Sequence, residues 1–78
     1  MIVGEGTELF VEPVPSALEG TRLGESGIGA RTGLNVVAVR HDGSSVGNPS
    51  ADTELPAGAE LVMLGTSEQH RQFTKVYA

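Results

Sequence analysis

The chain has 78 residues, which allows one domain with a small core and no second domain. It contains no cysteine, so neither a disulfide nor a thiolate metal site stabilises it. Ten acidic residues against five scattered basic ones give a formal net charge of -5 and no basic stripe for phosphates, so we expect no nucleic-acid partner.

The first predicted element is a strand over residues 8–12. Its apolar residues Leu9 and Val11 alternate with glutamates and one phenylalanine, which is typical of a strand whose two faces differ. Pro13 ends the strand, because proline cannot donate a hydrogen bond to the ladder.

A glycine-rich segment follows over residues 16–33. Gly24, Gly27 and Gly29 lie inside its helical part, and each costs roughly 1 kcal/mol relative to alanine in a helix interior. We therefore predict a short or interrupted helix over residues 22–32, held by tertiary contacts more than by helix propensity.

The strongest local signal is a β-hairpin whose first strand covers residues 34–40. Asp42-Gly43 supplies the two positive φ angles of a type I′ turn, and a short return strand follows. Strict alternation places Val37 and Val39 on one face. Because both faces of this strand are largely apolar, we expect it to be buried on both sides or to lie at a subunit contact.

The last strand is predicted over residues 60–64, and a helix begins after it. Thr66 and Gln69 have the spacing of a capping box, and Phe73 and Tyr77 lie on one face of that helix. The order β-α-β-β-β-α predicts a small α+β domain with a mixed or antiparallel sheet.

Signals for catalysis and metal binding are weak. The glycine-rich run 27–33 precedes a strand instead of following one, so a helix end is a better interpretation than a phosphate loop. His41 and His70 lack a third ligand at diagnostic spacing, which favours two partly exposed histidines over a metal site. A small acyl- or phospho-transfer enzyme is disfavoured, because no nucleophile–base pair is visible and the chain has little core to wall a pocket.

One set of residues is a candidate ligand site. Arg31 ends the weak helix, Asn35 opens the hairpin and Pro49 follows it, and Ile28 and Val36 are apolar neighbours. A planar donor, an amide and an apolar floor suit a small anionic or nucleotide ligand. The simpler interpretation makes the arginine a charge at a helix C-terminus and the other two polar positions turn residues.

Four segments, in order, resemble the TrkA C-terminal domain, also called the C-terminal domain of the RCK module (regulator of K+ conductance). They are Gly-Thr-Arg-Leu-Gly-Glu at 20–25, Thr-Gly-Leu-Asn-Val-Val-Ala-Val-Arg at 32–40, Asn-Pro-Ser-Ala-Asp-Thr at 48–53 and Ala-Gly-Ala-Glu-Leu-Val-Met-Leu-Gly at 57–65. The resemblance covers roughly residues 8 to 77.

This resemblance implies a regulatory α+β unit that dimerises and senses a ligand for K+ channels, K+ transporters or some antiporters. Some members of the family bind cyclic di-AMP at the dimer interface, through contacts that match Asn35, Val36 and Pro49 here. The binding arginine of those members corresponds to Gly29 in this chain, and Arg31 is displaced from it.

We therefore expect a non-catalytic regulatory domain over residues 8–78, preceded by a flexible lead-in over residues 1–7. It is expected to act in a potassium or other cation channel or transporter system, as a homodimer that senses a small regulatory ligand and has no intrinsic cofactor. The alternative is a dimerisation or scaffold module of a membrane transporter that binds no ligand. No apolar run approaches the ~20 residues of a membrane span, so the expected cytoplasmic location at the inner face of the membrane depends on a partner or on the parent chain.

Overall fold

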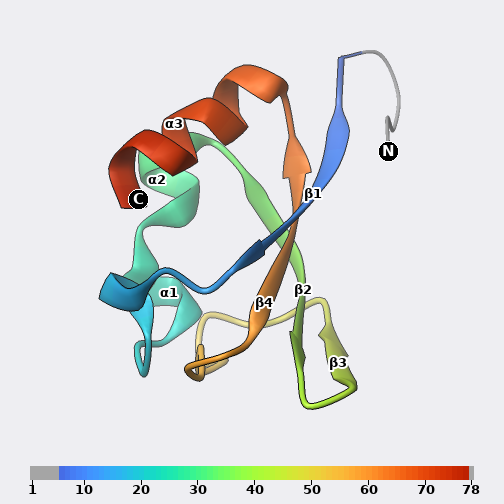
Figure 1. Ribbon diagram of the computed structural model, residues 1–78, viewed down its shortest axis with the longest axis vertical. Helices are drawn as coiled ribbons and strands as arrows, with labels where there is room; N and C mark the ends of the chain where they lie inside the picture. The colour runs from blue at the N-terminus through green and yellow to red at the C-terminus, as the bar shows by residue number, and fades with distance from the viewer. Residues whose placement is uncertain (1–5, 78) are drawn as a thin grey trace.

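The computed structural model describes residues 6–77, which form one β-sheet and several short helices (Figure 1). The strands are β1 (Glu8–Pro13), β2 (Asn35–His41), β3 (Ser44–Gly47) and β4 (Glu60–Gly65). The helices are the 3-10 turn η1 (Ser16–Leu18), α1 (Leu23–Ser26), α2 (Ile28–Thr32) and α3 (Ser67–Tyr77). The α+β class is confirmed, while most of the lead-in expected over residues 1–7 lies outside the described residues.

The four strands are antiparallel throughout and lie in the order β1-β4-β2-β3. The last strand of the chain, β4, is therefore inserted between the first strand and the hairpin. Two inner strands share the centre of the sheet, and the parallel pairing that a mixed sheet would need does not occur among these strands. β1 and β3 form the two edges.

Strand β2 departs from strict alternation at a β-bulge. Val36 pairs with Met63 and Val39 with Leu61, so β2 uses three steps where β4 uses two. The extra residue brings Val36 and Val39 to the same face, which is the face of two fully buried side chains of β4. The prediction that Val37 and Val39 share a face is wrong, because a one-residue insertion reverses the facing of every residue beyond it.

The core lies between the sheet and the helices, which all cover the same face (Figure 1). Phe10, Met63 and Val39 contribute to it from three strands, and Phe73 contributes from α3. Leu55 is fully buried and anchors the irregular segment before β4, where an isolated bridge also forms. In this arrangement α2 packs against both α3 and β2.

The opposite face of the sheet carries a second set of apolar side chains, none of which belongs to the core cluster. Cross-strand pairing places Leu9 beside Leu64, and Val62 between Val11 and Ala38. Val11 is 44% exposed, and the other four side chains are half-buried. The apolar composition of both strand faces thus reflects one core face and one face that no described helix covers.

Two sequence signals for helix boundaries are confirmed. Gly27 has φ 75° and separates α1 from α2, so the glycine-rich helix is interrupted as predicted. At the start of α3, the Thr66 N–H donates to Gln69 Oε1 and the Gln69 N–H donates to Thr66 Oγ1, at 2.9 and 3.1 Å, which is a complete capping box. No helix within residues 6–77 is both long and apolar enough to cross a membrane.

Candidate functional site

An open pocket of about 210 Å³ lies where the short helices meet the start of β2. Its walls come from α1 and α2, its floor from β2, and one side from the segment that follows β3. The lining residues are Leu23, Ser26, Ile28, Gly29, Leu34, Asn35, Val36 and Pro49. The pocket therefore combines elements that are distant in sequence, and it carries no charged side chain.

Four of the five residues singled out in the sequence line this pocket. Ile28, 2% exposed, and Val36 supply an apolar surface, while the exposed Asn35 offers an amide and Pro49 closes the side formed by the hairpin exit. The arrangement offers a shallow apolar surface with one amide able to donate and accept hydrogen bonds.

Arg31 does not line the pocket. It is exposed on the last turn of α2, and its side chain lies beside Gly27. A Cβ added at Gly27 would be only 3.2 Å from the Arg31 Nε atom. The expectation that its guanidinium joins the amide and the proline at one edge is not met, because one turn of helix carries the side chain toward the preceding loop instead. At position 29, which does line the pocket, a Cβ would meet only the Leu34 carbonyl oxygen, at 3.9 Å.

Two buried hydroxyls, which sequence reasoning did not single out, hold the pocket wall together. Ser26 Oγ donates to the Leu23 carbonyl at 2.7 Å and accepts from the Ile28 N–H at 3.3 Å. Thr32 Oγ1 donates to the Ile28 carbonyl at 2.6 Å and accepts from the Leu34 N–H at 3.1 Å. Local side chains thus satisfy backbone groups that such short helices leave unpaired. In the sequence, the only indication of these hydrogen bonds is a serine or threonine near the end of each short helix.

The α1–α2 corner, residues 26–28, is also contacted from the far end of the chain. Tyr77, in the last turn of α3, donates its hydroxyl to the Ser26 carbonyl at 2.9 Å. Its ring packs against Phe73 with centroids 5.2 Å apart and planes tilted by 49°. Burial raises the pKa of the Tyr77 phenol above its ordinary value, and the nearby Arg31 charge partly offsets that rise. At neutral pH the phenol therefore keeps its proton and acts as a donor.

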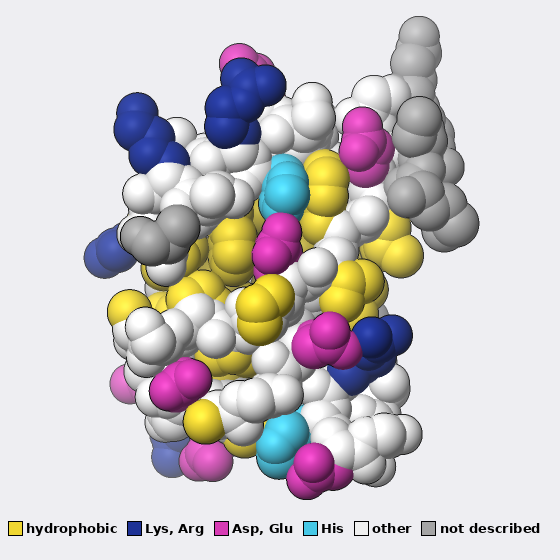
Figure 2. All heavy atoms as spheres, in the orientation of Figure 1, with side chains coloured by type: hydrophobic (Ala, Val, Ile, Leu, Met, Phe, Trp, Pro, Cys, Tyr) yellow, Lys and Arg dark blue, Asp and Glu magenta, His cyan; other side chains and the backbone are white. Residues whose placement is uncertain are grey.

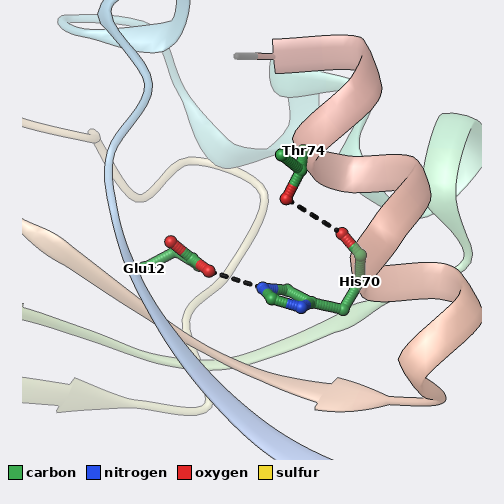
Figure 3. Close-up of polar contacts among 3 residues, drawn as sticks. All are labelled: Glu12, His70 and Thr74. Atoms are coloured by element: carbon green, nitrogen blue, oxygen red, sulfur yellow. Dashed lines mark hydrogen bonds and ion pairs between the residues drawn. The ribbon is translucent and has the colours of Figure 1, made fainter.

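A second polar contact links α3 to β1 (Figure 3). His70 Nε2 lies 2.5 Å from Glu12 Oε2, and the His70 ring stacks on Phe10 with centroids 4.1 Å apart. Both polar side chains are roughly one-third exposed, and Thr74 adds a bond from its hydroxyl to the His70 carbonyl. Sequence reasoning predicted a partly exposed histidine here but not its partner, because the two are far apart in the chain. Residues 6–77 contain no cluster of three or more potential metal ligands.

Two larger hollows lie elsewhere on the molecule. One of about 570 Å³ is at the hairpin end of the sheet, beside the Arg40–Glu60 ion pair. The other, of about 330 Å³, is an apolar groove between α3 and the Pro13–Pro15 segment, and Figure 2 shows hydrophobic side chains gathered beneath the helix on this face. Neither contains a residue of the predicted ligand site.

The family comparison matches nearly the whole described chain. The model of the TrkA-C domain matches residues 8–77. No curated protein matches the chain significantly. Among solved structures, the GsuK RCK domain is 33% identical with a TM-score of 0.86, and the match covers 94% of this chain and 16% of that one. The chain thus spans about one-sixth of the length of that relative. The GsuK channel with NAD bound is 32% identical, with a TM-score of 0.84 and coverages of 90% and 13%.

Two more distant neighbours share the fold. The RCK C domain of the potassium transport protein KtrA, in complex with cyclic di-AMP, is 20% identical with a TM-score of 0.82, and the match covers 90% of this chain and 82% of that one. BusR of S. agalactiae, in complex with its busAB-promoter DNA, is 21% identical with a TM-score of 0.74 and coverages of 92% and 35%.

These matches agree with the fold described above. The antiparallel four-stranded sheet and C-terminal helix are those of RCK C domains, and the resemblance that rested on four sequence segments is confirmed. The chain belongs to the TrkA-C domain family.

Proposed function

We propose that this chain is a dimerising, ligand-sensing regulatory domain of a potassium or other cation channel or transporter system. The observation that carries the proposal is the pocket in which Ile28, Asn35, Val36 and Pro49 meet within a TrkA-C domain. It is supported by relatives of two kinds: the GsuK channel has been solved with NAD, and the KtrA domain with cyclic di-AMP.

The size of the pocket favours binding between two copies. Its volume of about 210 Å³ is below the roughly 300–1,000 Å³ of typical small-molecule sites. It is also open to solvent, and no charged residue lines it. Two such pockets facing one another across a two-fold axis would enclose a nucleotide-sized ligand, with an Asn35 amide from each copy on opposite sides. A symmetric ligand such as cyclic di-AMP matches that symmetry and is the first compound to test.

The regulatory mechanism follows from differential affinity. A ligand held between two pockets favours the arrangement of the two copies in which both pockets contact it. The attached or associated membrane protein then responds to that arrangement. The domain contributes no catalytic group and no intrinsic cofactor in this mechanism, and its place is the cytoplasmic side of the membrane, through a partner subunit or the parent chain. We keep the prediction that nucleic acid is not a partner, although BusR binds DNA.

A thermal-shift assay tests the ligand proposal. At 100 times its dissociation constant, a ligand raises the free energy of unfolding by about 2.7 kcal/mol. For a domain of this size that corresponds to roughly 10 °C or more in Tm. Cyclic di-AMP should produce the shift in the wild-type chain, and Asn35→Ala should lose most of it. Gln72→Ala, an exposed change on α3, is the matched control and should keep it. No shift with cyclic di-AMP, NAD or related nucleotides would contradict the sensing role.

The uncovered sheet face specifically favours the alternative function, a dimerisation module without a ligand. That face carries Leu9, Val11 and Val62. The chain as a whole is acidic, so charge repulsion between two copies has to be considered. Among the described strand residues, the charged side chains of this face are Arg40 and Glu60, which pair with each other at 2.6 Å. These strands therefore add no net charge to the face that would repel a second copy. In this alternative, two apolar sheet faces pack on one another.

Sedimentation of two lysine variants separates the two dimer models. Val11→Lys places a charge on the uncovered face, while Val46→Lys places one on a similarly exposed valine of β3 whose partner, Val39, belongs to the core face. If the sheet faces form the dimer, Val11→Lys should be monomeric and Val46→Lys dimeric. If the pocket edge forms it, both variants should remain dimeric.

A further inference from the structure

The wall of the candidate pocket is built from elements that are too short to be stable alone. α1 has four residues and α2 has five, well below the ~12–15 residues that an isolated helix needs. Between them, Gly27 adopts a left-handed conformation, which carries no steric penalty for glycine. Glycine has no side chain that could pack against the rest of the protein. Ser26 and Ile28 flank this glycine, and both line the pocket. Their position therefore depends on contacts from outside the corner.

The longest helix supplies such a contact. Tyr77 Oη lies 2.9 Å from the Ser26 carbonyl oxygen, a hydrogen bond that spans 51 residues of sequence. The tyrosine ring is itself held by Phe73, which is 4% exposed in the core. Toward its other end, the capping box of Thr66 closes the first turn of α3, and the Glu12–His70 contact links the helix to β1. The phenol thus extends from a well-fixed helix to a weakly fixed corner.

We propose that Tyr77 is a positioning residue for the pocket: its hydroxyl holds the Ser26 carbonyl, and with it the wall that Ser26 and Ile28 form. Only the identity of the ligand rests on the proposed function. The positioning of Ser26 by Tyr77 does not depend on which ligand the pocket binds. Tyr77 does not line the pocket, so it acts through the corner and not by contact with a ligand. Ligand affinity is in this way tied to the position of the last turn of α3.

The test compares two variants that each remove one hydroxyl from α3. Tyr77→Phe deletes the donor to the corner and keeps the ring. Thr74→Val deletes a donor whose acceptor, the His70 carbonyl, lies in the same helix. Amide hydrogen exchange is then followed by NMR at Ile28, which donates to Ser26 Oγ, and at Arg31, which donates to the Gly27 carbonyl. Amides of β4 report global stability.

We expect Tyr77→Phe to speed exchange at the Ile28 and Arg31 amides relative to β4 by roughly 2- to 12-fold, the effect of one lost hydrogen bond. Thr74→Val should leave that ratio unchanged. Unchanged corner amides in Tyr77→Phe, or equal acceleration in β4, would overturn the proposal, because the hydroxyl would then have no role or only a global one.

Cyclic di-AMP titration by calorimetry adds a functional readout. If the wild-type chain binds this probe, Tyr77→Phe should weaken binding by a similar factor while Thr74→Val should not, and equal affinities for all three proteins would count against the positioning role. If the wild-type chain does not bind it, the ligand part of the proposed function fails for this probe, and the exchange ratio alone decides whether Tyr77 positions the corner.

Discussion

The β2–β3 hairpin turns at Asp42 and Gly43, whereas the α1–α2 corner turns at Gly27 alone. All three residues have positive φ, between 52° and 77°. The hairpin turn is stabilised by pairing of the strands on either side of Asp42-Gly43, and the paired residues are close in sequence. The corner is supported by buried hydroxyls and by Tyr77, 51 residues away. The chain thus contains one turn that local residues encode and one that depends on the rest of the fold, and the candidate ligand pocket lies at the dependent one.

This difference bears on the proposed ligand-sensing role. A pocket built on a rigid hairpin alone would respond little to other parts of the molecule. Here the floor, from β2, belongs to the sheet, while the walls belong to short helices whose stability comes from tertiary contacts. A ligand that contacts both the floor and the walls would stabilise the short helices, and four expected outcomes test this difference.

The largest expected effect is on the sheet. Leu61 is fully buried at the centre of β4, so Leu61→Ala should lower the free energy of unfolding by about 2–5 kcal/mol, through lost burial and a residual cavity. Val46→Ala, at a valine that is 51% exposed on β3, is the control and should change it by about 0.5 kcal/mol or less. Urea unfolding measures both. A small effect of Leu61→Ala would mean that the sheet is not more stable than the α1–α2 corner.

The next effect concerns the ligand. Gly29 lines the pocket, and a Cβ there meets no close neighbour. By the sequence resemblance, it stands at about the position of the arginine of family members that bind cyclic di-AMP. Gly29→Arg should supply the charged donor that the pocket lacks and strengthen cyclic di-AMP binding by roughly tenfold or more, as charge-assisted hydrogen bonds do. Arg31→Gln is the control and should change affinity little, since that side chain lies outside the pocket. Calorimetry measures both, and a weaker-binding Gly29→Arg variant would argue against this pocket as the site.

A pair of alanine substitutions sharpens the description of the corner. Gly27→Ala forces a left-handed conformation on an alanine and should cost about 1–2 kcal/mol of stability. Gly29→Ala occupies an ordinary helical position with free space and should stabilise the chain by about 0.4–1 kcal/mol. Thermal unfolding of the two variants gives opposite signs if α1 and α2 are two helices with a break between them. Equal signs would indicate one continuous helix.

The smallest expected effect is at alkaline pH. The pKa of Tyr77 is raised in the folded state, mainly by burial, from its ordinary value of 10.0. The folded chain therefore holds its phenolic proton more tightly than the unfolded chain, so the stability contributed by the protonated phenol is complete below pH 10 and declines as pH rises through the folded pKa. Between pH 9 and pH 11, urea unfolding should show a steeper loss of stability for the wild-type chain than for Tyr77→Phe. Parallel pH profiles would show that the phenol is not buried enough to matter.

Local signals predicted much of this fold. The Asp42-Gly43 turn, the Thr66–Gln69 capping box and an interruption of the glycine-rich helix were all expected, because each involves residues within a few positions of one another. The structure places that interruption at Gly27. Four residues of the candidate site line one pocket, since the ends of neighbouring elements meet at one edge of a small sheet. Whether they bind a ligand stays a prediction.

The misses share a different cause. The bulge in β2, which brings Val36 and Val39 to one face, arises from pairing with β4 some 25 residues away. The Glu12–His70 contact joins residues 58 positions apart, and the Tyr77–Ser26 bond joins residues 51 apart. Arg31 was assigned to the pocket by its proximity in sequence, but helix geometry directs it elsewhere.

By itself, then, the sequence determined the family, the element order and the turns, because these depend on residue types at short spacing and on backbone preferences that act locally. Only the tertiary structure decided which face of β2 enters the core, which hydroxyls brace the glycine-rich corner and that Arg31 lies outside the pocket. Those features depend on register and side-chain direction across the sheet and between helices, where one residue of slip or a fraction of a helical turn reverses the outcome.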